Sequence, residues 1–197
     1  MKEKFILGLD VSTKCCGIAL FNENGDLLEL SHISPKVKPQ PISKTEELIK
    51  KAELFKDYIK KYEKLELKHI IIEEPLLRSN NVNTVGVLLR FNGMITKICY
   101  DMFGVTPEYI NTYEARKNAF PILMQPGSRK VPVLFGAYPN DVNKKHVIWE
   151  LVSKREPQIK WLINKKGNLQ TENFDMADAY VTILGYLNKK KLEETAE

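Results

Sequence analysis

Short apolar runs separated by polar turns make up the first third of the chain. Runs of this kind predict strands at five places, over residues 4–9, 17–21, 26–33, 69–72 and 108–110. The Asn24-Gly25 dipeptide between the second and third runs is a strong hairpin signal, so the first three strands are expected to pair antiparallel. The run 69–72 is apolar without interruption, which is typical of a strand buried on both faces.

Longer segments repeat their apolar residues every three or four positions, which predicts helices over 43–62, 83–103, 144–155 and 174–187. Ser43 and Glu46 form a capping-box pattern at the start of the first helix. The segment 34–41 holds three prolines and is expected to be a loop. Between 116 and 143 proline and glycine break the pattern, so a long loop or an irregular insertion is expected there, and such loops are frequently functional.

This order of elements predicts an α/β protein with a central mixed five-stranded sheet flanked by helices. At 197 residues and 22.7 kDa, a single domain is expected over 1–188, followed by a frayed charged tail over 189–197. No run of 18 apolar residues occurs, so no transmembrane helix is expected. The apolar segment at the N-terminus is short and is interrupted by Asp10, so it does not resemble a signal peptide.

Charge and cysteine content narrow the function only slightly. The net charge is +5, and many lysines and arginines occur in pairs, which can merge into a phosphate-binding surface. Most lysine pairs are simply solvated, so from charge alone a nucleic-acid partner and an ordinary surface are equally supported. Three cysteines, two of them adjacent and none at zinc-ligand spacing, are expected to be reduced thiols.

Acidic residues occur where the apolar segments end. Asp10 follows the first strand, Glu73 and Glu74 follow the run 69–72, and Asp175 and Asp178 share one face of the last predicted helix. Each has an ordinary explanation, as a turn residue, a surface strand end or an acid in a helix's first turn.

Together, these acids would repel one another if the fold brought them into one place, and divalent cations would remove that cost. Oxygen ligands suit Mg²⁺ or Mn²⁺, and two such ions about 4 Å apart would activate a water and stabilise the leaving oxygen of a phosphodiester.

The ordered set GLDVSTKCCGIAL, IIIEEP and FDMADAY resembles the RuvC-like Holliday junction resolvases of the ribonuclease H-like superfamily. The resemblance spans about residues 5 to 187 and implies a ribonuclease H-like fold with two Mg²⁺ or Mn²⁺ ions per active site. The metal-binding catalytic acids that it implies are Asp10, Glu73, Asp175 and Asp178. Asp10 would bridge both ions, and Glu73 is preferred to Glu74 because the family's acid directly follows the apolar run, although that register can slip by one.

The same resemblance implies a homodimer that resolves four-way DNA junctions by paired symmetric nicks. The helix around 83–103 would be the dimer element, and products would carry 5′-phosphates and 3′-hydroxyls. The family places lysines near the scissile phosphate, and Lys144 or Lys145 match one such position, with Lys117 a looser match.

Two departures bear on DNA binding. Leu76 and Leu77 stand where bacterial members carry an aromatic wedge, and Arg129 and Lys130 lie in the 116–143 segment, where they offer an extra DNA contact or belong to a plain insertion.

Other functions remain open at this point. The chain would also suit a less selective nuclease of the same fold, acting on flaps, forks or RNA–DNA hybrids, or a non-catalytic junction-binding protein. The first motif alone resembles the phosphate hairpin of sugar-kinase and actin-like ATPases, but these need two such domains and the chain is too short for both. A cytoplasmic location in a bacterial or phage-infected cell is expected.

Overall fold

The structure is a computed structural model, and it describes residues 3–39, 41–75, 81–125, 133–134 and 143–195. Five strands form one sheet, as the sequence predicts, with the order β3-β2-β1-β4-β5. Their bounds are β1 Lys4–Val11, β2 Cys16–Asn22, β3 Leu27–Ile33, β4 Glu66–Glu73 and β5 Glu108–Ile110. The first three strands pair antiparallel, whereas β4 pairs parallel with β1 and with β5, so the sheet is mixed.

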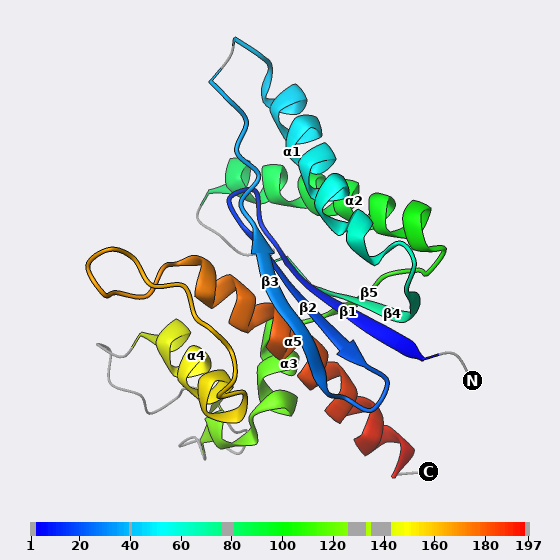
Figure 1. The fold of residues 1–197 in the computed structure, drawn as a ribbon, viewed down its shortest axis with the longest axis vertical. Coiled ribbons are helices and arrows are strands. Elements are labelled where there is room, and N and C mark those ends of the chain that lie inside the picture. The colour runs from blue at the N-terminus through cyan, green and yellow to red at the C-terminus, as the bar shows by residue number, and fades with distance from the viewer. Residues whose placement is uncertain (1–2, 40, 76–80, 126–132, 135–142, 196–197) are drawn as a thin grey trace.

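Helices cover both faces of this sheet (Figure 1). One face carries α1 (Lys44–Ile59) and α2 (Val82–Phe103), and the other carries α3 (Thr112–Ala119), α4 (Lys144–Arg155) and α5 (Glu172–Glu194). Alternate residues of β4 enter different cores: Ile70 and Ile72 pack with α1 and α2, and Ile71 packs with α3 and α5. The expectation that this strand is buried on both faces is therefore confirmed.

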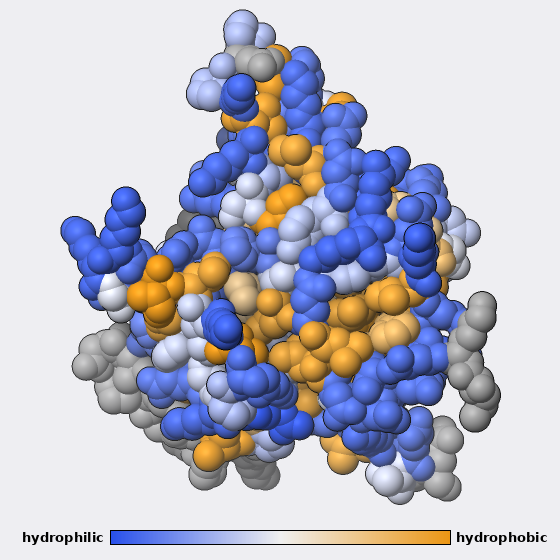
Figure 2. Space-filling view, viewed as in Figure 1, coloured by the Kyte–Doolittle hydropathy of each residue, from blue (hydrophilic) through white to orange (hydrophobic). Residues whose placement is uncertain are grey.

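The surface shows the same division into layers. Hydrophilic residues cover most of α1, and hydrophobic residues gather in a band over the strands below it (Figure 2). The four apolar residues that predicted the first helix are all buried, namely Leu48, Ala52, Phe55 and Ile59. Across the described part of the chain, no helix combines the length and the apolar character that a membrane crossing requires.

The segment from 116 onward begins differently from the expectation. Residues 112–119 form α3, whose N-cap Asn111 accepts a hydrogen bond from the Tyr113 amide. The helix is followed by a 3₁₀ turn, Pro121–Leu123, and by the two-stranded pair β6 (Met124–Gln125) and β7 (Val133–Leu134). The prediction of an irregular segment from 116 is therefore wrong for 116–119, and most of 124–142 lies outside the described residues.

The last helix is longer than the sequence predicts. It begins at Glu172 and continues to Glu194, so residues 189–194 are helical rather than frayed. Ion pairs stabilise this end, because Lys189 contacts both Glu114 of α3 and Glu193, and Lys190 contacts Glu193. The first strand is also longer than predicted, since it runs through Asp10 to Val11.

Candidate functional site

Two of the predicted acids meet at one edge of the sheet. In the parallel pair β1–β4, Leu9 lies opposite Ile72. The next residues, Asp10 and Glu73, therefore lie side by side at the carboxyl ends of adjacent strands. This edge is where ligands bind in open α/β sheets. Beyond Asp10, the Ser12 hydroxyl accepts hydrogen bonds from the amides of Lys14 and Cys15 and closes a tight turn into β2.

The first two turns of α5 bring the other two acids to the same edge. Gly17 of β2 lies opposite Asp10, and a Cβ atom on Gly17 would fall 1.9 Å from the carbonyl oxygen of Asp175. Only a residue without a side chain allows helix and strand to approach this closely. The contact places Asp175 and Asp178, one turn apart, over the end of β1.

The four acids line one cleft of about 430 Å³. Its walls come from β1, β4, α2, α3, α4 and α5, so every layer of the fold contributes to it. The lining residues are Asp10, Val11, Ser12, Glu73, Glu74, Pro75, Leu88, Thr112, Arg116, Lys145, Asp175 and Asp178.

The environment of Asp10, Glu73 and Asp175 disfavours the charged forms of these carboxyl groups. Desolvation, followed by the charges of Glu73 and Asp178, raises the pKa of Asp10 well above its usual value. Burial and the charge of Asp178 raise the pKa of Glu73 to about 7, although a hydrogen bond from Thr112 opposes the shift. Burial also raises the pKa of Asp175. The cleft therefore needs more positive charge than the protein alone supplies.

Two basic side chains supply part of that charge. Arg116 Nη2 of α3 donates to Asp178 Oδ1 at 2.8 Å, and both side chains are largely buried. Lys145 Nζ of α4 lies 3.4 Å from Asp175 Oδ1, and half of its side chain is exposed.

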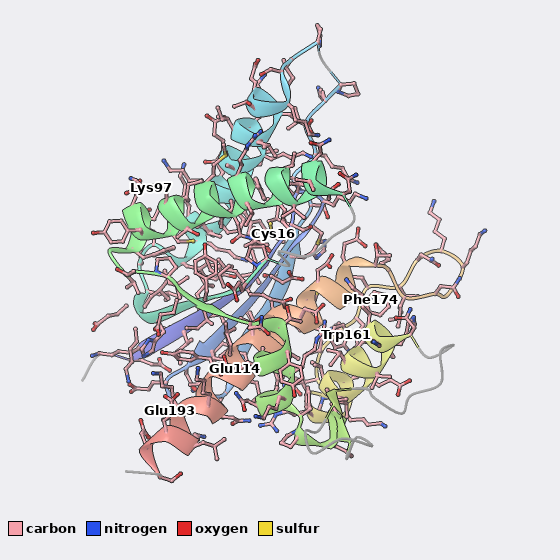
Figure 3. All side chains as sticks on the ribbon, turned by 180° about the vertical axis from the view of Figure 1, so that it is seen from behind. Cys16, Lys97, Glu114, Trp161, Phe174 and Glu193 are labelled. Atoms are coloured by element: carbon pink, nitrogen blue, oxygen red, sulfur yellow. The ribbon has the colours of Figure 1, made fainter. Side chains whose placement is uncertain are left out.

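An aromatic contact positions Lys145. The next residue, His146, packs on Phe174 in the first turn of α5 with ring centroids 4.8 Å apart. On the same face of α4, Trp149 contacts the His146 ring and packs edge-on against Trp161. Viewed from behind, Phe174 and Trp161 lie beside α4, at the end of the molecule where α5 begins (Figure 3).

Glu73 rather than Glu74 faces the interior of the cleft. Thr112 Oγ1 donates to Glu73 Oε1 at 2.6 Å, and the Glu73 side chain is half-buried, whereas Glu74 is exposed. The backbone amide of Glu74 donates to the Ile110 carbonyl and extends the contact between β4 and β5 by one residue. This arrangement favours the register in which Glu73 is the functional acid.

The structure brings only some of the predicted basic and DNA-binding residues to the cleft. Lys145 lines it, but the exposed residues Lys144 and Lys117 do not belong to the described lining. The other four predictions concern Leu76, Leu77, Arg129 and Lys130, which lie outside the described residues.

Sequence reasoning missed Arg116 and Thr112 because it missed the helix that carries them. A signal for that helix was present: Asn111 is a favoured N-cap residue, and the buried Ala115 and Ala119 are four positions apart. The three cysteines are free thiols, as expected, and all three are buried.

The donor chemistry of the cleft fits a divalent cation, although the side chains are not arranged around one. Within the described residues, no group of three or more His, Cys, Asp or Glu side chains has the geometry of a metal site. The acids are instead held by their ion pairs with Arg116 and Lys145. Five carboxyl groups, including the exposed Glu74, line the cleft against two cationic side chains and leave unmet negative charge, and oxygen-only ligands suit Mg²⁺ or Mn²⁺.

Comparison with solved structures decides the fold. The chain is similar to Thermus thermophilus RuvC in complex with a Holliday junction substrate, with a TM-score of 0.59, 10% identity and 96% of each chain covered. The chain has the RuvC-like fold. A second Thermus thermophilus RuvC structure aligns with a TM-score of 0.54 and 14% identity, again over 96% of each chain.

A eukaryotic protein shares the RuvC-like fold. The yeast mitochondrial Holliday junction resolvase Ydc2 aligns with a TM-score of 0.60 and 14% identity, over 94% of this chain and 78% of its own. No protein-family model and no curated protein matches the sequence. The expected ribonuclease H-like architecture is therefore confirmed by structure rather than by sequence similarity.

Proposed function

We propose that the protein is a metal-dependent endonuclease that cuts phosphodiester bonds in branched DNA, with the four-way junction as its substrate. The observation that carries this proposal is the convergence of Asp10, Glu73, Asp175 and Asp178 in one cleft of a RuvC-like fold. Such an arrangement of acids has a high electrostatic cost and gains nothing in a protein that only holds a phosphate backbone. The cost is understandable where the acids bind cations for catalysis.

The four acids would hold the ions, and the remaining residues of the cleft would prepare it for DNA. Bound Mg²⁺ or Mn²⁺, two per site in this proposal, would supply the charge stabilisation that hydrolysis of a phosphodiester requires. Thr112 fixes the orientation of Glu73 through its hydrogen bond. Lys145, which is half-exposed beside Asp175, is placed to contact the phosphate at the mouth of the cleft.

A basic groove offers a path for the DNA backbone beside the cleft. Ser12 lines the cleft, and the next two residues, Thr13 and Lys14, line a groove of about 560 Å³. Its other walls are the segment 35–39 and the start of α1, and they add Lys36, Lys38 and Lys51. Lys51 is paired with Glu47, whereas Lys14, Lys36 and Lys38 are exposed. We assign this groove to phosphates of one junction arm.

The proposed assembly is a homodimer through α2. Several large hydrophobic residues of this helix are exposed, among them Val82, Leu89 and Tyr100. A two-fold dimer would present two identical clefts to strands related by the symmetry of a junction, as paired nicks require. A cytoplasmic location belongs to the same proposal.

The test is the Asp10→Asn variant. We expect it to lower the rate of four-way junction cleavage in Mg²⁺ by at least about 100-fold, the scale for losing one electrostatic contributor to catalysis. Junction binding in EDTA, measured by gel shift, should be unchanged or stronger, because the variant removes a negative charge.

Asp57→Asn is the matched control, since Asp57 is an exposed acid on α1 that forms an ion pair with Lys60, away from the cleft. It should cut like the wild type. If Asp10→Asn cuts at the wild-type rate, the proposed site is wrong.

A less selective nuclease of the same fold is the second candidate, because the acids and basic residues that line the cleft suit any phosphodiester. Cleavage of a four-way junction, a flap, a duplex and an RNA–DNA hybrid at one salt concentration separates the two. We expect the junction to be cut fastest, and equal rates on all four would favour the second candidate.

A further inference from the structure

Arg116 lies inside the acidic cleft and is held there by a carboxylate. Its Nη2 atom is 2.8 Å from Asp178 Oδ1, and the exposed fractions of the two side chains are 17% and 7%. Charge-assisted hydrogen bonds of this kind are strong when water is excluded. The Nε atom of Arg116 is also buried and has no hydrogen-bond partner, so the guanidinium is not fully satisfied by Asp178.

The backbone beneath Arg116 cannot easily move away from Asp178. Both residues stand on helices that touch, because a Cβ atom on Gly185 of α5 would lie 2.3 Å from the Ala115 carbonyl oxygen of α3. Asn188 Nδ2 donates to the Asn118 carbonyl and joins the same two helices. Releasing the pair therefore needs a rotation of the side chains, not a shift of the helices.

Five carboxyl groups line the cleft, but Glu74 is exposed, so the balance is made for the other four. These four acids carry four negative charges when ionised, and Arg116 and Lys145 return two positive ones. One Mg²⁺ or Mn²⁺ ion brings this sum to zero. A second ion would leave two positive charges in a largely desolvated site unless an anion, such as a DNA phosphate, arrives with it.

We propose that Arg116 limits the DNA-free protein to one tightly bound divalent ion by occupying Asp178. The inference rests on the proposed function, because it assumes that these acids bind metal for cleavage. Asp178 becomes available to a second ion once the guanidinium turns to a phosphate, for which arginine is well suited because its planar fork binds phosphate oxygens in pairs. Arg116 is thus a positioning residue that couples metal loading to the presence of DNA.

The test is a Mn²⁺ titration of the DNA-free full chain, with bound ions counted by calorimetry and by the loss of the free Mn²⁺ signal in electron paramagnetic resonance. The wild type should bind one ion per chain in the tight phase. Arg116→Met should bind two, or bind the second roughly tenfold or more tightly, because a hydrogen bond to a charged group no longer competes for Asp178.

Lys117→Met is the matched control, since it removes the same charge from the exposed neighbour on α3 and should leave the ion count at one. If Arg116→Met is too unstable to titrate, Arg116→Lys replaces it, because lysine keeps the charge but loses the fork; a tighter second ion is again expected.

Two tight ions in the DNA-free wild type, or an unchanged titration in the Arg116 variant, would overturn the inference. Neither result bears on whether Asp10→Asn abolishes cleavage. Conversely, if Asp10→Asn still cuts, the proposed function fails even where the ion count depends on Arg116.

Discussion

Glu73 lies at the end of β4 with its carboxylate held by Thr112 and surrounded by other acids. The hydrogen bond favours its charged form, but burial and the charge of Asp178 outweigh it, so the pKa of Glu73 is raised to about 7. Between pH 4.5 and 7 the folded protein therefore keeps a proton that the unfolded chain has already lost. Metal-free stability falls as the pH rises through this window.

Glu73→Gln should remove this cost in EDTA. The amide oxygen still accepts from Thr112, and no charge forms as the pH rises. Relative to the wild type, the free energy of unfolding of the variant should be unchanged near pH 4 and larger at pH 7.5 by at most about 3 kcal/mol, from a pKa that rises from 4.5 to about 7.

Urea denaturation of both proteins at the two pH values measures this difference. A gap that does not depend on pH would contradict it. In saturating Mg²⁺ the order should reverse, because the ion stabilises the wild-type carboxylate and binds the variant less well.

At the residue scale, the acids were predictable and their cationic partners were not. Asp10 and Glu73 each end an apolar run, so the strand pattern alone locates them. Arg116 has no such marker, because its role depends on how α3 packs on α5, a contact between segments about 60 positions apart. Nothing in the local sequence distinguishes Arg116 from Lys117, yet one is buried on Asp178 and the other is exposed.

At the scale of elements, the contact between β2 and the first turn of α5 fixes the geometry of the cleft. Gly17 leaves room for the backbone of Asp175 directly over the strand. Because Gly17 is also paired with Asp10, any displacement of this turn separates the acids of α5 from the acid of β1. Gly17 therefore supports the site by allowing α5 to pack closely on β2.

Gly17→Ala should force this contact apart. Its Cβ atom would meet backbone atoms, which cannot rotate away as a side chain can. We expect a loss of stability of about 1–3 kcal/mol, typical of overpacking, and at least about tenfold slower cleavage.

The measurements are thermal unfolding and junction cleavage of the purified variant. Gly86→Ala is the stability control, since a Cβ atom there meets nothing within 4 Å and alanine favours the helix. A Gly17→Ala protein as stable and active as the wild type would show that the helix can yield without cost.

The elements themselves followed from the sequence where burial imposes a strong pattern. All five strands and four of the helices have apolar runs or repeats, and each was expected within a few residues of its observed bounds except at the C-terminal end of α5. The helix α3 was not predicted because it is short and mostly polar, with Ala115 and Ala119 as its buried residues. The C-terminal end of α5 was not predicted because an ion pair with α3, rather than apolar periodicity, supports it.

At the scale of the whole molecule, acids and lysines occupy adjoining surfaces. The acidic cleft and the groove that contains Lys14, Lys36 and Lys38 meet at the turn after β1. The opposite ends of the parallel strands also carry exposed lysines, Lys4, Lys64 and Lys68, far along β1 and β4 from the cleft. The proposed function therefore makes the position of positive charge, not its total, decide DNA affinity.

Replacing Lys14, Lys36 and Lys38 together by alanine should weaken junction binding and reduce the slope of log affinity against log salt by up to about 3, near 0.9 for each lost phosphate contact. Binding titrations between roughly 50 and 200 mM salt measure both the affinity and its salt dependence. The triple replacement of Lys4, Lys64 and Lys68 removes the same charge and should change the slope little. Equal losses in the two triple variants would count against the groove.

Because α5 follows β1 and β4 in the sequence, the cleft is completed late in protein synthesis. Asp10 and Glu73 leave the ribosome long before Asp175 and Asp178, and β1 must also wait for β4 before its parallel partner exists. Until α5 is synthesised, the nascent chain therefore holds at most half of the four acids and lacks the helix that closes the cleft. Under the proposed function, the site would stay inert until α5 has been made and has docked, so a chain terminated before α5 would not cut DNA.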